Sequence, residues 1–146
     1  MIVQSTRLGE LDVPDEQILE FPQGILGFPV EKRFALMEYK PASPFYFLQS
    51  LADPDLMFLM INPFAFFNDY EFAMDDALMG EIGVTADNPP TVFNIVTVKD
   101  KLANMTVNLA GPVLVNLRDG KAAQWVIEKT QFPTRYPLFP AGAGGK

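Results

Sequence analysis

The sequence predicts an all-β fold: a single-domain antiparallel β-barrel-like fold with one or two short helices. Three observations lead to this prediction. Short apolar segments with strand-like patterns follow one another closely, thirteen prolines fall mostly between them, and one stretch has the pattern of a helix. Many short strands with little helix are typical of a barrel or sandwich. At 146 residues, 49% of them hydrophobic, the chain is long enough to bury one such core.

The predicted strands begin at the N-terminus, where the first thirteen residues favour one or two strands with Gly9 as a bend or bulge. The later segments expected as strands are Phe34–Tyr39, Phe45–Leu51, Met57–Ile61, Thr91–Val98, Met105–Leu109, Pro112–Leu117 and Ala122–Glu128. Apolar and polar residues alternate in Met105–Leu109, which indicates a half-buried face. The β-branched run Thr91–Val98 suits a strand covered on both sides. Asp119-Gly120 between two apolar runs is a strong hairpin signal.

One helix is predicted over Asp75–Glu81. The paired acids at its start suit the helix dipole, and Gly83 suits the position that ends a helix. No internal repeat or linker divides the chain, so we expect one domain over residues 1–139. Residues 140–146 are rich in Gly and Ala and are expected to be a flexible tail or a cloning remnant.

Composition excludes several kinds of chemistry. The chain has no Cys and no His, so disulfides, thiol nucleophiles, Cys/His metal sites and imidazole-dependent triads are ruled out. A net charge of −7 argues against direct binding of nucleic acid. The start carries no signal pattern, and the longest apolar run, Leu56–Phe67, is interrupted and too short to span a bilayer. We expect a soluble cytoplasmic protein with no membrane partner and no cofactor, and an enzyme is the weaker class.

Charge is distributed unevenly along the chain. No Lys or Arg occurs between Pro41 and Val98, whereas this stretch holds eight acids and ten aromatic residues. Such an acidic, aromatic-rich surface favours a basic protein partner. The alternative is the usual arrangement, in which the aromatic residues form the core and the acids a solvated surface.

Two segments in this region are candidates for binding or turn structure. In Ile61–Phe72 closely spaced aromatic residues cannot all face one side of a strand, so some are expected at the surface, as in a protein-binding hot spot. The alternative is a buried Ω-type loop. Asp53-Pro54-Asp55 has the spacing of two calcium ligands, but Met57 occupies the third ligand position. A turn in which Asp53 binds backbone N–H groups is the favoured interpretation, and no metal is expected.

Several motifs resemble one family when taken in order. They are Phe21–Phe28, Phe47–Ser50, Asp53–Asp55, Asn62–Phe64, Asp69–Phe72, Met105–Leu109, Pro112–Asn116 and Phe132–Tyr136. Together they resemble FliW, the bacterial flagellar assembly factors, from about Thr6 to Leu138. Asn62 and Asn68 stand where the family often has an acid and a proline, and Phe132 and Tyr136 where it usually has Tyr and His.

The resemblance implies a small β-barrel-like protein without enzymatic activity. Members bind the carbon storage regulator CsrA, a small basic dimer that represses translation, and they also bind flagellin. The implied mechanism is a partner switch: the factor captures CsrA once flagellin has been secreted, which relieves repression of flagellin translation. The residues expected to bind these proteins are Asp53, Asp55, Asn62, Phe64, Phe66, Phe67, Asp69, Tyr70 and Glu71.

Two other classes remain as alternatives. A small barrel enzyme or cofactor carrier of the flavin-binding split-barrel kind would need a basic or backbone-rich phosphate site, which the acidic middle does not offer. A nucleic-acid-binding barrel would need a basic face with stacking aromatic residues. Here the aromatic residues stand beside acids, so this class ranks last.

Overall fold

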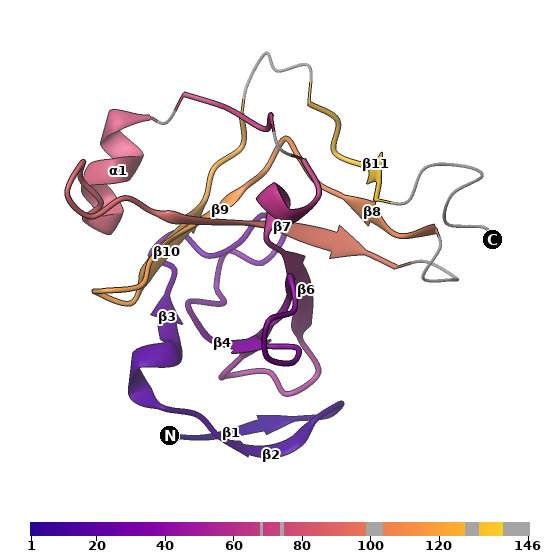
Figure 1. Cartoon of the computed structure of the whole chain (residues 1–146). Coiled ribbons are helices and arrows are strands. Elements are labelled where there is room, and N and C mark those ends of the chain that lie inside the picture. Colours follow the sequence, from indigo (N-terminus) through magenta and orange to yellow (C-terminus); the bar gives the residue numbers. More distant parts are fainter. Residues whose placement is uncertain (68, 74, 99–103, 128–131, 139–146) are drawn as a thin grey trace.

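A closed ring of seven strands forms the body of the molecule in the computed structural model, which describes residues 1–67, 69–73, 75–98, 104–127 and 132–138 (Figure 1). The ring runs β7-β6-β5-β4-β3-β10-β9 and closes because β9 pairs again with β7. Its strands are β3 (Ile18–Glu20), β4 (Arg33–Glu38), β5 (Phe45–Ser50), β6 (Met57–Ile61), β7 (Thr91–Thr97), β9 (Val113–Asn116) and β10 (Lys121–Gln124). Every pairing in the ring is antiparallel except that of β10 with β3.

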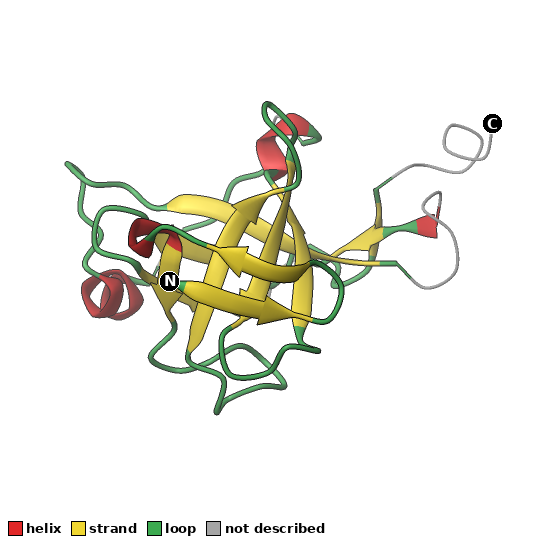
Figure 2. Ribbon diagram, turned by 90° about the horizontal axis from the view of Figure 1, so that it is seen from below, coloured by secondary structure: helices red, strands yellow, loops and turns green. Residues whose placement is uncertain are grey.

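The remaining elements decorate this barrel. A separate hairpin of β1 (Ile2–Ser5) and β2 (Gly9–Asp12) lies across the barrel strands, as Figure 2 shows from below. On another side, β8 (Thr106–Val107) pairs with β7, and β11 (Tyr136–Pro137) pairs with β8. The helical elements are η1 (Asp15–Gln17), η2 (Pro63–Ala65) and α1 (Asp76–Ile82).

The structure confirms the predicted fold class and most of its elements. The helix lies one residue later than predicted, because the Asp75 side chain caps it by accepting the Ala77 N–H at 2.9 Å. Gly83 ends the helix with a φ of 77°, a left-handed conformation that favours glycine. The Asp119-Gly120 hairpin is also confirmed, since β9 and β10 pair directly on either side of it.

Other expectations need correction. Neither β3 nor β11 was predicted, and Met105–Leu109 is a strand only at Thr106–Val107. The last predicted strand ends at Gln124, and its final residue, Glu128, lies outside the described residues. The predicted tail, residues 140–146, also lies outside them, and the domain boundary at residue 139 stays a prediction.

Four apolar clusters fill the described part of the molecule, and two of them bear on the candidate site. The main one lies inside the ring and includes Phe21 and Phe34, whose rings meet edge to face at 5.3 Å. A second cluster gathers Ile61, Tyr70, Val107, Leu109 and neighbouring residues where β6, β7 and β8 meet. Burial of apolar area is the main stabilising contribution to such a fold. The second cluster also anchors the chain that follows β6, and this chain forms the candidate site.

Candidate binding groove

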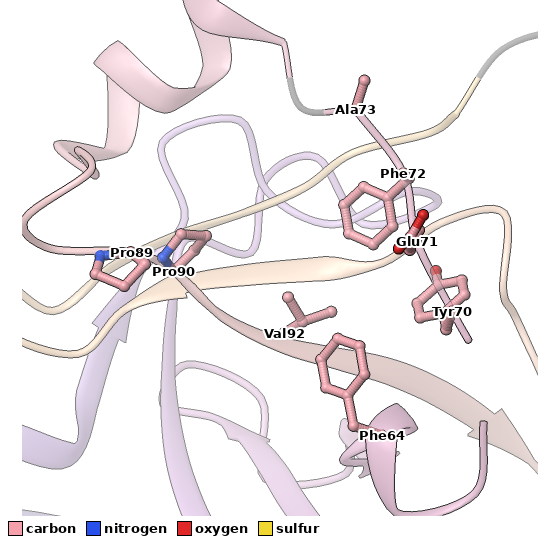
Figure 3. Close-up of a pocket in the computed structure, with 8 residues that line it drawn as sticks. All are labelled: Phe64, Tyr70, Glu71, Phe72, Ala73, Pro89, Pro90 and Val92. Carbon is pink, nitrogen blue, oxygen red and sulfur yellow. The ribbon is translucent and has the colours of Figure 1, made fainter. Parts of the chain in front are cut away.

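An open groove of about 700 Å³ lies beside β7 (Figure 3). The residues that line it are Phe64, Tyr70, Glu71, Phe72, Ala73, Pro89, Pro90 and Val92. The chain from Tyr70 to Ala73 runs along one side, and Pro89 to Val92 leads into β7 on the opposite side. Phe64 projects from η2 at one end. Most of the lining is apolar, so the groove suits an apolar side chain of a partner.

Phe64 is placed by the turn that follows β6. Asn62 caps η2 by accepting the Phe64 N–H at 3.1 Å, and Pro63 fills the first helical position, where its missing N–H is harmless. The Phe64 side chain is 47% exposed. The predicted protein-binding residue Asn62 therefore has a positioning role in the structure, whereas Phe64 offers apolar surface to the groove.

Tyr70 holds its side of the groove in place through hydrogen bonds to buried groups of the barrel. It is 4% exposed, and its hydroxyl donates to the Leu109 carbonyl at 2.6 Å while accepting from the Asn94 side-chain amide at 3.2 Å. Burial raises the pKa of Tyr70 above its ordinary value, and the hydrogen bond from Asn94 opposes this shift. Tyr70 was expected among the residues that bind the partner proteins. In the structure it holds the loop against the barrel.

Phe66 and Phe67 pack against the second apolar cluster and are half-buried. The Phe66 ring lies 6.0 Å from Phe45, and the Phe67 ring meets Tyr136 edge to face at 5.5 Å. The segment after β6 thus combines the two alternatives drawn from the sequence. Part of it packs as a loop on its own aromatic residues, and Phe64 remains at the surface.

Acidic side chains occur in the groove lining and close to it along the chain. Asp69 and Glu71 are exposed on its Tyr70–Ala73 side, and Asp87 is exposed in the turn before Pro89. None of these carboxylates takes part in an ion pair within the described residues, where the ion pairs join the Met1 ammonium to Asp12 and Asp15, and Arg118 to Asp119. Within the described residues, their negative charge is therefore not balanced by a paired cation.

Asp53 and Asp55 lie elsewhere. They belong to the turn between β5 and β6, at the opposite end of β6 from η2. Asp53 accepts the Asp55 N–H at 2.9 Å, which confirms the predicted turn, and Asp55 accepts a hydrogen bond from the Thr6 hydroxyl. The structure therefore separates the predicted binding residues into two places on the surface.

The groove also contains residues that the sequence did not indicate. The side opposite Tyr70 is formed by Pro89, Pro90 and Val92, and the side that contains Tyr70 continues to Ala73. A double proline before a β-branched run marks a strand start, but nothing in that local pattern shows that it faces residues 64–73. In the part of the chain that the structure describes, no cluster of acidic side chains could hold a metal ion. Over the same residues, no helix is long and apolar enough to cross a membrane.

Comparisons with known proteins agree along nearly the whole chain. A family model described as "FliW protein" matches residues 2–138. A flagellar assembly factor FliW of Desulfitobacterium hafniense (strain DSM 10664 / DCB-2) is 46% identical over 140 residues, covering 96% of this chain and 92% of that protein. The protein of the same name from Heliobacterium modesticaldum is 46% identical over 143 residues, covering 98% and 94% respectively.

A solved structure extends this likeness to three dimensions. The chain described as "Crystal structure of the flagellar assembly factor FliW" superposes with a TM-score of 0.88 and is 30% identical in sequence. The match covers 98% of this chain and all of that one. The barrel and its attached loops are thus shared as a unit.

Proposed function

The chain belongs to the FliW family of flagellar assembly factors, and from this premise we propose that it is a non-enzymatic binding protein for CsrA and flagellin in the cytoplasm. In this role it holds flagellin while flagellin is abundant and captures CsrA when flagellin has been secreted. Capture of CsrA relieves its repression of flagellin translation. The chain acts on messenger RNA only through CsrA and makes no direct contact with nucleic acid.

One observation supports CsrA most directly: an apolar groove is bordered by acids that have no ion-pair partner in the described residues. A basic protein would find both charge complementarity and apolar contact there. Phe64 supplies exposed aromatic surface, while Asp69 and Glu71 supply charge at the groove edge. Phe66 and Phe67 support this surface by packing beneath it.

The test is calorimetric titration of the chain with purified CsrA, alone and after saturation with flagellin. We expect submicromolar binding that flagellin abolishes. Reversing two charges with Asp69→Lys/Glu71→Lys should weaken CsrA binding several-fold at low salt, and the loss should shrink as salt screens the interaction.

The matched control is Glu10→Lys/Glu16→Lys, which changes the net charge equally on β2 and η1, away from the groove. If the acids at the groove contact CsrA directly, the groove variant should bind CsrA more weakly than the control variant does. Equal binding by both variants would show that only net charge matters. Absence of heat with either protein, from a folded sample, would contradict the proposed function.

A further inference from the structure

The side of the groove formed by Tyr70–Ala73 has, together with Asp69, the exposure pattern of a strand. Asp69, Glu71 and Ala73 are exposed, whereas Tyr70 is buried and Phe72 half-buried between them. Alternation with a period of two is the pattern of extended chain. Figure 3 shows Tyr70 to Ala73 running along the groove, with the Phe72 ring turned into it.

None of the described strands pairs with this segment. The backbone N–H and C=O groups of Glu71, Phe72 and Ala73 form no hydrogen bond with any described residue. Unpaired backbone groups on an extended, exposed segment are a template to which another chain can add as a strand. In such complexes the main chain provides affinity and alternate side chains provide specificity.

The opposite side of the groove cannot serve in this way. Pro89 and Pro90 have no N–H groups, so this side offers no donor at these two positions. It offers apolar surface instead, continued by Val92. A segment lying in the groove would therefore form hydrogen bonds on the Glu71–Ala73 side and only apolar contacts on the other.

We propose that the groove binds an extended segment of the basic partner, which pairs with Glu71–Ala73 as an added strand. An apolar side chain of that segment occupies the space between Phe64, Phe72 and Val92. Lys or Arg residues next to it face Asp69 and Glu71, whose carboxylates are exposed and have no ion-pair partner in the described chain. This inference depends on the proposed function, because it takes CsrA as the basic partner.

Ala73→Pro tests the backbone pairing directly. The variant removes one exposed N–H that has no partner in the described residues, so it breaks no described hydrogen bond of the free chain. Proline also restricts the preceding residue to extended conformations, which the exposure pattern already assigns to Phe72. Ala86→Pro is the matched control: Ala86 is exposed in the turn Thr85–Asn88, outside the groove lining, and its N–H has no described partner either.

The experiment measures CsrA affinity by calorimetry for wild type and both variants, with thermal unfolding as the check on folding. Hydrogen–deuterium exchange of wild type is then compared with and without CsrA. We expect Ala73→Pro to weaken binding about tenfold, as the loss of a main-chain hydrogen bond predicts, and Ala86→Pro to bind like wild type. The amides of residues 71–73 should exchange more slowly in the complex.

Wild-type affinity in Ala73→Pro together with unprotected amides at 71–73 would overturn the strand pairing and leave the proposed function intact. A wild-type chain that binds neither CsrA nor flagellin would instead overturn the proposed function, and the strand pairing with it.

Discussion

The Asn94 side-chain amide donates a hydrogen bond to the Tyr70 hydroxyl at 3.2 Å, and thereby links the interior of β7 to the segment that borders the groove. The same amide donates to the Asn108 carbonyl at 2.8 Å, and Tyr70 donates to Leu109 at 2.6 Å. Asn94 is fully buried. The shape of the groove therefore depends on polar contacts inside the second apolar cluster.

Tyr70→Phe should lower the free energy of unfolding by about 1–3 kcal/mol, because it leaves the buried Leu109 carbonyl without this donor. Urea denaturation at neutral pH measures the change. Tyr39→Phe is the control, since Tyr39 is 56% exposed, and it should stay within about 0.5 kcal/mol of wild type. Equal stability of the two variants would contradict the anchoring role of Tyr70.

Alkaline pH should narrow the stability difference between wild type and Tyr70→Phe. Burial raises the pKa of Tyr70 in the folded chain. Above the ordinary tyrosine pKa of about 10, the unfolded chain releases the proton while the folded chain still holds it. Wild type therefore loses stability as the pH rises from there toward the folded pKa, and Tyr70→Phe lacks this contribution. Denaturation midpoints at a series of pH values between neutral and alkaline measure it, and a constant difference would contradict it.

Much of the barrel could be predicted because many of its strands and turns have recognisable local sequence patterns. The hairpin at Asp119-Gly120 and the helix between Asp75 and Gly83 are encoded by neighbouring residues. Closure of the ring could not be predicted in this way. It depends on β3, a three-residue strand too short to show a period, and on its parallel pairing with β10 about a hundred residues later.

Of the candidate site, too, only the part encoded by neighbouring residues could be predicted. Local composition identified the acidic aromatic segment after β6, and the structure places Phe64 and Glu71 in the groove. The far side, at Pro89 and Pro90, comes from a different part of the chain and is brought there by the start of β7. The anchoring of Tyr70 could likewise not be predicted from the local sequence, because its partners Asn94 and Leu109 belong to other segments.

Gly24→Ala should destabilise the chain more than Gly27→Ala. Both glycines have left-handed φ angles, 70° and 87°, which cost an alanine about 1–2 kcal/mol. Only at Gly24 would the added methyl group also meet backbone, 2.6 Å from the Phe28 oxygen and 2.7 Å from Pro29. The region around Gly27 is open. Thermal unfolding of the two variants isolates this steric contribution, and equal melting temperatures would show that the loop shifts freely.

Gln49→Glu should destabilise the chain by more than about 2 kcal/mol at neutral pH, because it places a charge among carbonyl oxygens. The buried Gln49 side-chain amide donates to the backbone carbonyls of Ser50, Asp53, Pro54 and Leu56 at 3.1–3.3 Å. These hydrogen bonds hold the β5–β6 turn together. Gln17→Glu, at an exposed position in η1, is the control and should have little effect. Urea denaturation of both variants compares them, and a tolerated Gln49→Glu would mean that the turn opens at little cost.

Because the two acidic places lie apart, the proposal that the groove binds CsrA predicts unequal effects when each is neutralised. Asp69→Asn/Glu71→Gln removes two carboxylates that have no described ion pair, so it should weaken binding and flatten the salt dependence. Asp53→Asn/Asp55→Asn should weaken binding less, because these side chains lie in the β5–β6 turn, outside the groove lining, where they accept hydrogen bonds from the Asp55 N–H and the Thr6 hydroxyl. Asparagine can accept the same bonds, so the turn is preserved while its charge is removed. Calorimetric titrations at two salt concentrations compare the pairs. A larger loss from the Asp53/Asp55 pair would place the proposed CsrA site at the opposite end of β6 and not in the groove.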